Sequence, residues 1–457
     1  MNRVAVLNVV GLTGRLLARM PRCRALACDG ASAAIHTVTP AVTCPVQATM
    51  MTGLAPAGHG VVANGWYERE SAEVRFWRQS NRLVAGEKVW ETARRRDPSF
   101  TCANLFWWFN MYSSVDVAVT PRPMYTADGR KIPDLWTNPP GLRDDLQRDC
   151  GRFPLFKFWG PGAGIESSEW IGRCARMVED RFTPTLSLIY LPHLDYALQR
   201  LGPADPAIEA EAAAIDNLVG GLVEFLRSRG VTPIVLSEYG VTSVSRPIAV
   251  NRALREAGLL AVRDELGRDK LDAGASRAFA VADHQIAHVY VNDSAALDAT
   301  RETVTALPGV ERVLDEAGQR SIGLAHARAG DLVLISEADA WCTYDYWVDD
   351  ARAPDYARTV DIHRKPGYDP RELFIDPAIR WPRARVAWTL LRKRLGSRAL
   401  LDVIPLDATL VRGSHGRVTD APDDGPMILS PEPGVVEEDA VDAAAVREII
   451  LWALFRG

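Results

Sequence analysis

The stretch Thr39-Pro-Ala-Val-Thr-Cys-Pro-Val-Gln-Ala-Thr-Met-Met-Thr-Gly53 combines hydroxyl side chains, prolines and a run of small residues that opens a helix. His59-Gly60 and Asn64-Gly-Trp-Tyr67 follow it closely. A helix N-terminus offers free N–H groups and the positive end of the helix dipole to an anion. Thr43, just before the Pro45 that starts the helix, is therefore a candidate nucleophile for a phosphorus centre. An ordinary loop-to-helix junction is the alternative interpretation.

The size and the net charge of the chain limit the number of domains and the kinds of partner that can be expected. The chain has 457 residues and a net charge of −5, which allows one large α/β domain with insertions or several smaller ones. The negative charge argues against a nucleic-acid polymer as partner. The seven cysteines lack regular spacing, which favours a reducing compartment. With no signal peptide and no apolar stretch of membrane-spanning length, the sequence predicts a cytoplasmic protein without a membrane partner.

Short apolar runs bounded by turn residues alternate with amphipathic stretches. Runs at 4–10, 186–191, 233–236 and 288–291 predict strands buried on both faces, and 207–228 predicts a helix. This alternation predicts an α/β fold with a mostly parallel central sheet flanked by helices. Such sheets bind ligands at the carboxyl ends of their strands.

Polar residues occur where three of these runs end. Asn8 lies near the end of the first run, Asp195 follows the second, and Glu238 and Tyr239 follow the third. We expect these side chains to meet at one edge of the sheet.

Residues 95–170 have a different composition from the rest of the chain. They are rich in aromatic residues, proline and glycine, as in the runs 106–112 and 153–160. We predict a core formed by residues 1–94 and 171–457, with 95–170 inserted as a cap over the site or as a dimer surface. A satellite core under long loops is the alternative.

The order of these motifs resembles the opening, middle and end of the type I phosphodiesterase / nucleotide pyrophosphatase family, a branch of the alkaline phosphatase superfamily. The resemblance covers nearly the whole chain and implies an alkaline-phosphatase-like fold. The residues that carry it are Asn8, Thr43-Cys-Pro, Asn64, Asp195, Gln199 with Gly202-Pro203, Glu238-Tyr-Gly240, and His415 in Gly413-Ser-His-Gly416.

The resemblance implies a hydrolase with two divalent ions, usually zinc, one of which activates the threonine nucleophile. Carried over by position, the first ion would be held by Asp195, Gln199 and His415. The second ion would be held by Asn8, Thr43, Glu238 and Tyr239. The substrate's phosphoryl group would be held by Asn64, the N–H of Cys44, and Tyr239.

Four of these positions depart from the family pattern. Asn8 and Glu238 stand where the family has Asp, and Gln199 and Tyr239 stand where it has His. Zinc prefers imidazole, thiolate and carboxylate ligands, whereas an oxygen-rich set suits Mg²⁺ or Mn²⁺ better. Each substitute keeps a polar group that bears oxygen, while decay of a buried site would more often leave apolar side chains. The pattern favours a working hydrolase with altered metal chemistry.

Other residues are candidates to replace the lost ligands. His193 would share a strand face with Asp195, and His363 is a second candidate. In a metal-poor site, cations would stabilise the phosphate instead; the candidates are Arg364, Lys365 and Lys131. We interpret the polar residues of 276–288 as serving buried backbone groups, with a ligand role as the alternative. His36, His59 and His326 are interpreted as structural or solvent-facing.

The sequence thus predicts hydrolysis of a phosphodiester, a pyrophosphate or a phosphate ester on a small phosphorylated substrate. The aromatic stretch favours a nucleotide-like group, because a flat ring stacks on aromatic side chains. A homodimer is a further expectation. Two alternatives are kept: a silent or metal-poor relative that binds a phosphorylated ligand, and a phosphonate or phosphomonoester hydrolase.

Overall fold

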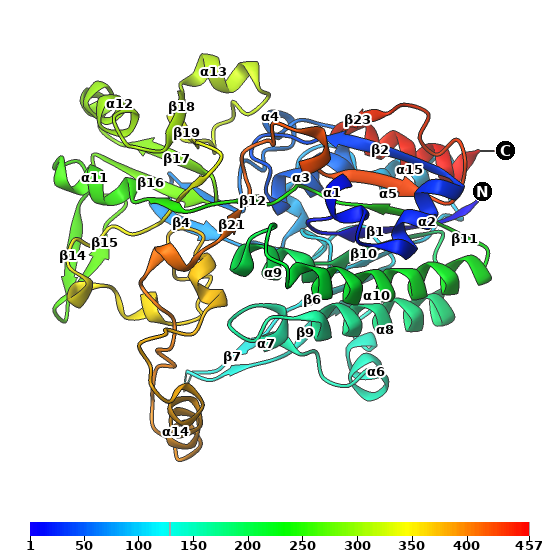
Figure 1. Cartoon of the computed structure of the whole chain (residues 1–457), viewed down its shortest axis with the longest axis horizontal. Helices are drawn as coiled ribbons and strands as arrows, with labels where there is room; N and C mark the ends of the chain where they lie inside the picture. The colour runs from blue at the N-terminus through cyan, green and yellow to red at the C-terminus, as the bar shows by residue number, and fades with distance from the viewer. Residues whose placement is uncertain (128, 457) are drawn as a thin grey trace.

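The structure is a computed structural model and describes residues 1–127 and 129–456. A large sheet covered by helices holds both chain ends, and a smaller body with its own sheet lies at the far side (Figure 1). In spatial order the strands of the large sheet are β23 (Ala440–Asp442), β2 (Ala31–His36), β22 (Met427–Ser430), β11 (Val231–Leu236), β1 (Arg3–Val9), β10 (Leu186–Leu191), β5 (Cys102–Leu105), β6 (Val117–Pro121) and β9 (Leu135–Asn138). The predicted α/β class is confirmed.

Strand β1 lies at the centre of this sheet and runs parallel to both β10 and β11. From Val4 onward its residues are buried, as expected for a strand covered on both faces. The register pairs Asn8 with Tyr190 of β10 and with Leu236 of β11. The carboxyl ends of these three strands therefore lie side by side.

The direction of the strands changes toward both ends of the sheet. Strands β11, β1, β10, β5 and β6 are parallel. Strand β22, from near the C-terminus, lies between β11 and β2 and is antiparallel to both. Strand β9 is antiparallel to β6 at the other end.

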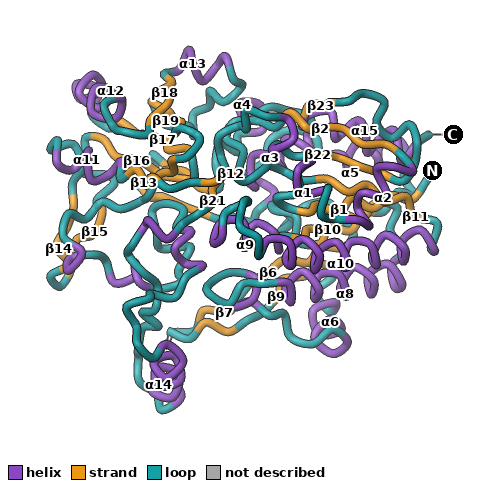
Figure 2. The backbone as a smooth tube through the Cα atoms, viewed as in Figure 1, coloured by secondary structure: helices purple, strands orange, loops and turns teal. Residues whose placement is uncertain are grey.

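Two groups of helices cover the sheet (Figure 2). The first group is α8 (Ile165–Phe182), α9 (His193–Leu201) and α10 (Ile208–Ser228). The second is α3 (Thr43–Thr52), α5 (Val89–Arg96) and α15 (Val446–Phe455). Every residue of α3 is buried, because α15 packs over it. Shorter helices are α1 (Gly14–Leu17), α2 (Pro21–Asp29), α4 (Pro56–His59), α6 (Leu142–Asp149) and α7 (Leu155–Phe158).

The smaller body contains an antiparallel sheet. Its strands, in spatial order, are β16 (Ala278–Asp283), β17 (Ile286–Val291), β19 (Leu332–Ser336) and β18 (Val310–Leu314). Around it lie α11 (Val250–Glu256), α12 (Leu297–Thr305), α13 (Glu316–Ser321), β13 (Arg246–Ile248), β20 (Ala340–Cys342) and the hairpin β14 (Val262–Glu265)–β15 (Arg268–Leu271). The predicted strand at 288–291 belongs here, to β17, and not to the parallel sheet.

The aromatic-rich stretch 95–170 is divided between the sheet and its surroundings. Strands β5, β6 and β9 are part of the central sheet. The hairpin β7 (Met124–Tyr125)–β8 (Lys131–Ile132) and helix α7 project beside it (Figure 1). A cap over the site can thus be formed only by part of this stretch.

Helix α14 (Pro382–Arg394) stands apart from both sheets (Figure 1). Most of its residues are exposed, and Trp388 on it is 62% exposed. Within residues 1–127 and 129–456, no helix combines the length and the apolar character that crossing a membrane requires.

Candidate active site

The predicted polar residues meet at the carboxyl edge of the parallel strands. Asn8 is the second-to-last residue of strand β1, and Glu238 and Tyr239 are close to the end of β11. Asp195 lies in the first turn of helix α9, which follows β10. All four side chains are buried. The parallel register brings them together, as expected from the sequence.

Thr43 is the first residue of helix α3. Its Oγ1 lies 3.2 Å from the hydroxyl oxygen of Tyr239. The preceding Val42 gives this helix end no side-chain cap, so the positive end of the helix dipole faces the same space as the Thr43 hydroxyl.

Cys44 and Asn64, the two predicted phosphoryl contacts, touch each other. The backbone N–H of Cys44 donates to Asn64 Oδ1 at 3.0 Å. Asn64 in turn donates from its backbone N–H and from Nδ2 to the two carboxylate oxygens of Asp283, at 2.8 and 3.1 Å. Asp283 therefore fixes the orientation of this amide.

Asp195 is held by its own helix and by the late histidine. Gln199, one turn along α9, donates from Nε2 to Asp195 Oδ2 at 2.8 Å and accepts from the Tyr368 hydroxyl at 2.8 Å. His415 Nε2 lies 3.7 Å from Asp195 Oδ1, while His415 Nδ1 donates to the carbonyl of Ala41 at 2.8 Å. Burial raises the pKa of Asp195 to about 7, although hydrogen bonds from Gln199 and Tyr239 oppose the shift.

Glu238 accepts hydrogen bonds from two amide side chains. Asn8 Nδ2 donates to Glu238 Oε1 at 2.5 Å, and Gln47 on α3 donates to the same oxygen. Burial raises the pKa of Glu238 to about 8, and these two hydrogen bonds only partly offset it. Three buried oxygens at this edge have no hydrogen-bond partner among the described residues: Asn8 Oδ1, Glu238 Oε2 and Asp195 Oδ1.

Four aromatic rings form a continuous stack beside these carboxyl groups. Tyr239 stacks on His415 with ring centroids 3.6 Å apart, His415 contacts His284 at 3.8 Å, and His284 stacks on Tyr368 at 3.6 Å. Burial lowers the pKa of both histidines. The rings are therefore neutral and pack as flat surfaces.

Above this stack opens an aromatic pocket. Its empty space, counted to the open mouth, is about 1050 Å³. Thr43, Asp195, Tyr239, His284 and His415 are among the residues that line it. Further aromatic residues line it too, with the cationic residues Arg122 and Lys131 and with His363: Trp77, Trp108, Phe156, Phe158, Trp159, Tyr196 and Tyr368.

Gln47 was missed by the sequence reasoning, whereas Asp283 and His284 belong to the run 276–288, for which a ligand role was the alternative interpretation. In the structure this run contains β16 and the start of β17, which form a hairpin whose turn contains His284. The interpretation holds for His288 in this run, since its Nε2 donates to the carbonyl of Val62 at 3.1 Å. The sequence signal was a polar triplet, Asp-His-Gln, that interrupts an apolar run.

His193 does not share a face with Asp195. The segment is helical, and two positions along a helix point to different sides. His193 Nε2 contacts Glu211 on α10 at 2.9 Å, and His193 is not among the residues that line the pocket.

The candidate cations are placed differently from one another. Lys131 lines the pocket together with His363. Arg364 is paired with Asp361 at 3.2 Å. Lys365 is buried behind the pocket wall and is not available to a phosphate.

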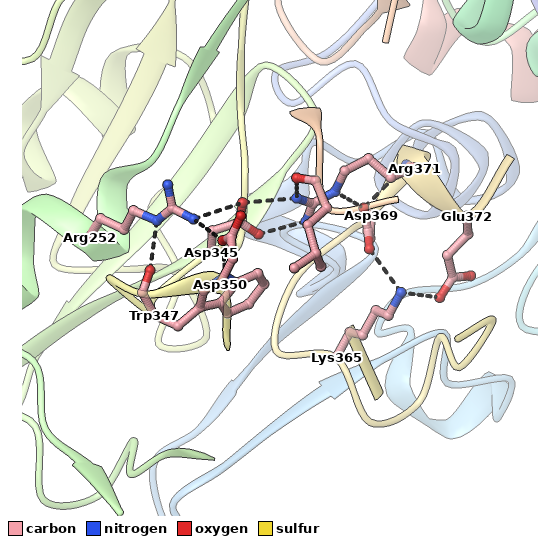
Figure 3. A network of polar contacts seen from close by, with 9 residues as sticks. Arg252, Asp345, Trp347, Asp350, Lys365, Asp369, Arg371 and Glu372 are labelled. Carbon is pink, nitrogen blue, oxygen red and sulfur yellow. Dashed lines mark hydrogen bonds and ion pairs between the residues drawn. The ribbon is translucent and has the colours of Figure 1, made fainter. Parts of the chain in front are cut away.

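A buried network of charges supports that wall (Figure 3). Lys365 Nζ lies 2.8 Å from Asp369 and 2.7 Å from Glu372, and both of its partners are almost inaccessible to solvent. Arg371 connects Asp369 to Asp345 through contacts of 2.7 and 2.6 Å.

This network reaches the pocket through one aromatic residue. The indole N–H of Trp159 donates to Glu372 Oε2 at 2.5 Å, and Trp159 lines the pocket. Lys365 therefore positions Glu372, and Glu372 fixes one wall of the pocket.

The residues present do not fit the two-zinc centre that the resemblance implies. His415 alone supplies an imidazole where the family pattern has three, and the Gln199 amide donates into the Asp195 carboxylate. In residues 1–127 and 129–456, no group of three or more His, Cys, Asp and Glu side chains is arranged to hold a metal ion. Amide oxygens are poor zinc ligands, so no chemical step is assigned to a zinc pair here.

Comparisons with known sequences point to one family. The family model for type I phosphodiesterase / nucleotide pyrophosphatase matches residues 4–369. An uncharacterized pyrophosphatase/phosphodiesterase of Schizosaccharomyces pombe is 25% identical over 216 residues, which are 45% of this chain. The matched region spans 37% of that relative's own length.

Solved structures share the fold. Murine ectonucleotide pyrophosphatase / phosphodiesterase 5 aligns with a TM-score of 0.60 at 13% identity, over 99% of this chain and 95% of that chain. Phosphonoacetate hydrolase from Sinorhizobium meliloti 1021, in complex with phosphonoacetate, aligns with a TM-score of 0.63 at 15% identity and with the same coverage. The murine protein is also known as an inactive variant in complex with AMP. The predicted alkaline-phosphatase-like fold is confirmed.

Proposed function

The chain belongs to the type I phosphodiesterase / nucleotide pyrophosphatase family, and on that premise we propose that its aromatic pocket hydrolyses a phosphodiester or pyrophosphate linkage with Thr43 as the nucleophile. Membership of this family places the chain among the phosphoric ester hydrolases. One observation carries the proposal: Thr43, at the start of a buried helix, contacts Tyr239, and the buried carboxyl groups of Asp195 and Glu238 lie at the same edge of the sheet.

The proposed reaction has two steps. The Thr43 oxygen bonds to phosphorus as the bond to the leaving oxygen breaks, and the leaving group departs as an alcohol or a phosphate. Water then adds to phosphorus as the bond to Thr43 breaks, and the threonine hydroxyl is restored. The Tyr239 hydroxyl, 3.2 Å from Oγ1, orients the nucleophile. The start of α3 and the Asn64 amide favour the negative charge that develops on the phosphoryl oxygens.

Members of this family are metalloenzymes that use divalent cations. The unpartnered oxygens of this site fit one hard cation, Mg²⁺ or Mn²⁺, better than zinc, because they are amide and carboxylate oxygens. We assign this cation to Asn8 Oδ1, Glu238 Oε2 and Thr43. When bound there, it would neutralise negative charge on a phosphoryl group.

The pocket walls support a substrate with a flat leaving group. Trp77, Trp108 and Trp159 provide ring faces, on which a nucleotide base would stack. Lys131 and Arg122 at the same pocket would attract a second phosphate. The proposed substrate is therefore a small nucleotide-like phosphoric ester, processed without a nucleic-acid polymer or a membrane partner. The homodimer and the cytoplasmic location stay predictions.

Turnover of bis-p-nitrophenyl phosphate by the purified chain, supplied with Mg²⁺ or Mn²⁺, tests this proposal. We expect release of p-nitrophenol that Thr43→Ala abolishes, because the nucleophile is removed. Thr49→Ala, at a buried threonine of the same helix, is the matched control and should keep activity. Phosphate release from phosphonoacetate and from p-nitrophenyl phosphate separates the phosphonate and phosphomonoester alternatives.

A second candidate is a metal-poor protein that binds a phosphorylated ligand. The four stacked rings favour it, because neutral packed rings occupy the space beside Asp195 where the family pattern has ligands. In that case calorimetry would detect binding of AMP by the wild-type chain, and none of the ester classes above would be turned over.

A further inference from the structure

His284 occupies a backbone position that favours glycine. It is the first residue of the turn between β16 and β17, whose pairing continues up to Asp283 and Ile286. Its φ is +62°, whereas Gln285 beside it does not have a positive φ. This pattern is that of a type II′ turn, whose first central residue is normally Gly. Any residue with a side chain at such a position lowers the free energy of unfolding relative to glycine, and such residues gather at functional sites.

The turn itself does not need the imidazole ring. The carbonyl of His284 accepts from the N–H of Cys342 at 2.7 Å, and the N–H of Gln285 donates to the carbonyl of His415 at 2.9 Å. Both bonds use backbone atoms, which glycine also has. The imidazole is therefore kept for a purpose other than folding the hairpin.

The ring of His284 has a fixed orientation. Its Nδ1 lies 2.8 Å from Asp283 Oδ1, and both side chains are buried. Asp283 also accepts from the backbone and side chain of Asn64. Because this carboxylate accepts three hydrogen bonds, Nδ1 carries the ring proton and Nε2 keeps a free lone pair.

The side chain of His284 is part of the pocket lining. His284 lines the pocket with Thr43 and lies between the rings of Tyr368 and His415. Among the described residues, the hydrogen bond found for the His284 ring is the one between Nδ1 and Asp283. A neutral acceptor repels a phosphate oxygen but binds the O–H of a water molecule or hydroxyl.

We propose that His284 is a catalytic residue whose Nε2 holds the water that attacks phosphorus, and that Asp283 is the residue that positions it. The inference rests on the proposed function, because it concerns the second step, in which water releases the phosphoryl group from Thr43. Asp283 connects this step to Asn64, the predicted phosphoryl contact, through the two hydrogen bonds that it accepts from that residue.

His284→Gly separates the two steps. Thr43 can still attack bis-p-nitrophenyl phosphate, but the water of the second step is no longer held. We expect kcat to fall about 100-fold, with a burst of one p-nitrophenol per chain and a nitrophenyl-phosphoryl adduct on Thr43 in the intact mass. The melting temperature should fall, because the relief of the positive φ is smaller than the loss of the buried ring between Tyr368 and His415 and of its hydrogen bond to Asp283. A merely structural residue would produce no adduct.

Leu266→Gly is the matched control. Leu266 also has a positive φ, of +55°, in the turn between β14 and β15, and its side chain is fully exposed far from the pocket. This variant should change neither kcat nor the intact mass. His284→Asn, which also tolerates a positive φ, should reproduce the loss of turnover if the glycine variant folds poorly.

The possible results are distinct. A wild-type rate in His284→Gly, or a loss of turnover with no adduct, as expected for Thr43→Ala, overturns the role of His284. A wild-type chain that releases no p-nitrophenol and acquires no adduct overturns the proposed function, and this inference with it.

Discussion

The histidines of this chain differ in what their two ring nitrogens contact. His288 uses both nitrogens on the backbone, since Nε2 donates to Val62 and Nδ1 accepts from the N–H of Gly330 at 3.1 Å. His59 uses both as well, on Thr49 and on the N–H of Val61. His284, which lines the pocket, is hydrogen-bonded to Asp283 through Nδ1, and no such bond is found for its Nε2 among the described residues. Ring partners, and not burial alone, therefore separate structural histidines from a functional one.

The structural histidines predict how stability depends on pH. Burial lowers the pKa of His288 to about 4, whereas a histidine of the unfolded chain titrates near 6.5. Between these values the unfolded chain binds the proton and the folded chain does not. The free energy of unfolding therefore does not depend on His288 protonation above pH 6.5. Below pH 6.5 this group lowers it by about 1.4 kcal/mol per pH unit as the pH drops toward 4.

Urea unfolding at pH 7.5 and at pH 5 measures this loss. His288→Gln should lower stability at both values but reduce the difference between them. His36→Gln, at an exposed histidine, should leave the difference unchanged. An equal pH dependence in the wild-type chain and in His288→Gln would contradict the assignment.

The residues of the site could be predicted where they follow a predicted strand or where motif order carries them. Thr43, Asp195 and His415 follow from the family pattern, and the structure brings them to one pocket. Gln47 was missed, and a site role for His284 was only the alternative interpretation, because both roles depend on which chain segments meet in space. The polar triplet Asp-His-Gln interrupts the apolar run, but a turn without glycine or asparagine does not identify this break as a hairpin.

Between residues 359 and 373, charge pairs replace regular secondary structure. This segment has one short 3-10 turn, Pro370–Leu373, yet it carries Ile362, His363 and Tyr368 to the pocket. The buried contacts of Lys365 and Arg371 hold it in place (Figure 3). The pocket wall therefore depends on ion pairs more than on a helix or a strand.

Lys365→Met should destabilise the fold strongly. Removing the ammonium leaves Asp369 and Glu372 buried without their shared partner, which costs about 3–5 kcal/mol. Arg364→Met, one position earlier on an exposed side chain paired with Asp361, should cost less than about 1 kcal/mol. Chemical denaturation of both variants compares them directly, and similar losses would show that the buried network is not what holds the wall.

The strands were predicted where apolar runs are short and bounded by turns. The runs at 186–191 and 233–236 correspond to β10 and β11, because strands buried on both faces need continuous apolar sequence. Strands β5 and β6 were hidden within an aromatic-rich composition that suggested an insertion. The sheet to which 288–291 belongs could not be read from its sequence either, because periodicity does not identify the neighbouring strand.

At the scale of the whole molecule, a bound cation should stabilise the fold. If Mg²⁺ or Mn²⁺ binds the unpartnered oxygens of Asn8 and Glu238, the melting temperature should rise with cation concentration. A concentration of 100 times Kd corresponds to about 2.7 kcal/mol. Glu238→Gln should remove the rise, and zinc should produce a smaller one.

Differential scanning fluorimetry with each chloride salt measures this effect without any substrate. Glu337→Gln, at a partly exposed glutamate paired with Arg246, is the control and should respond like the wild-type chain. A shift with zinc alone, or a shift that survives in Glu238→Gln, would contradict the assigned ligands.

The position of strand β22 in the sheet affects how the protein folds during its synthesis. It lies between β11 and β2, yet of the strands described in this sheet only β23 is translated after it. Until residue 430 has left the ribosome, the nascent sheet has a gap in its interior, bordered by two unpaired edges that could pair with another chain. A premature stop codon shortly before this strand would thus remove an interior strand of the sheet.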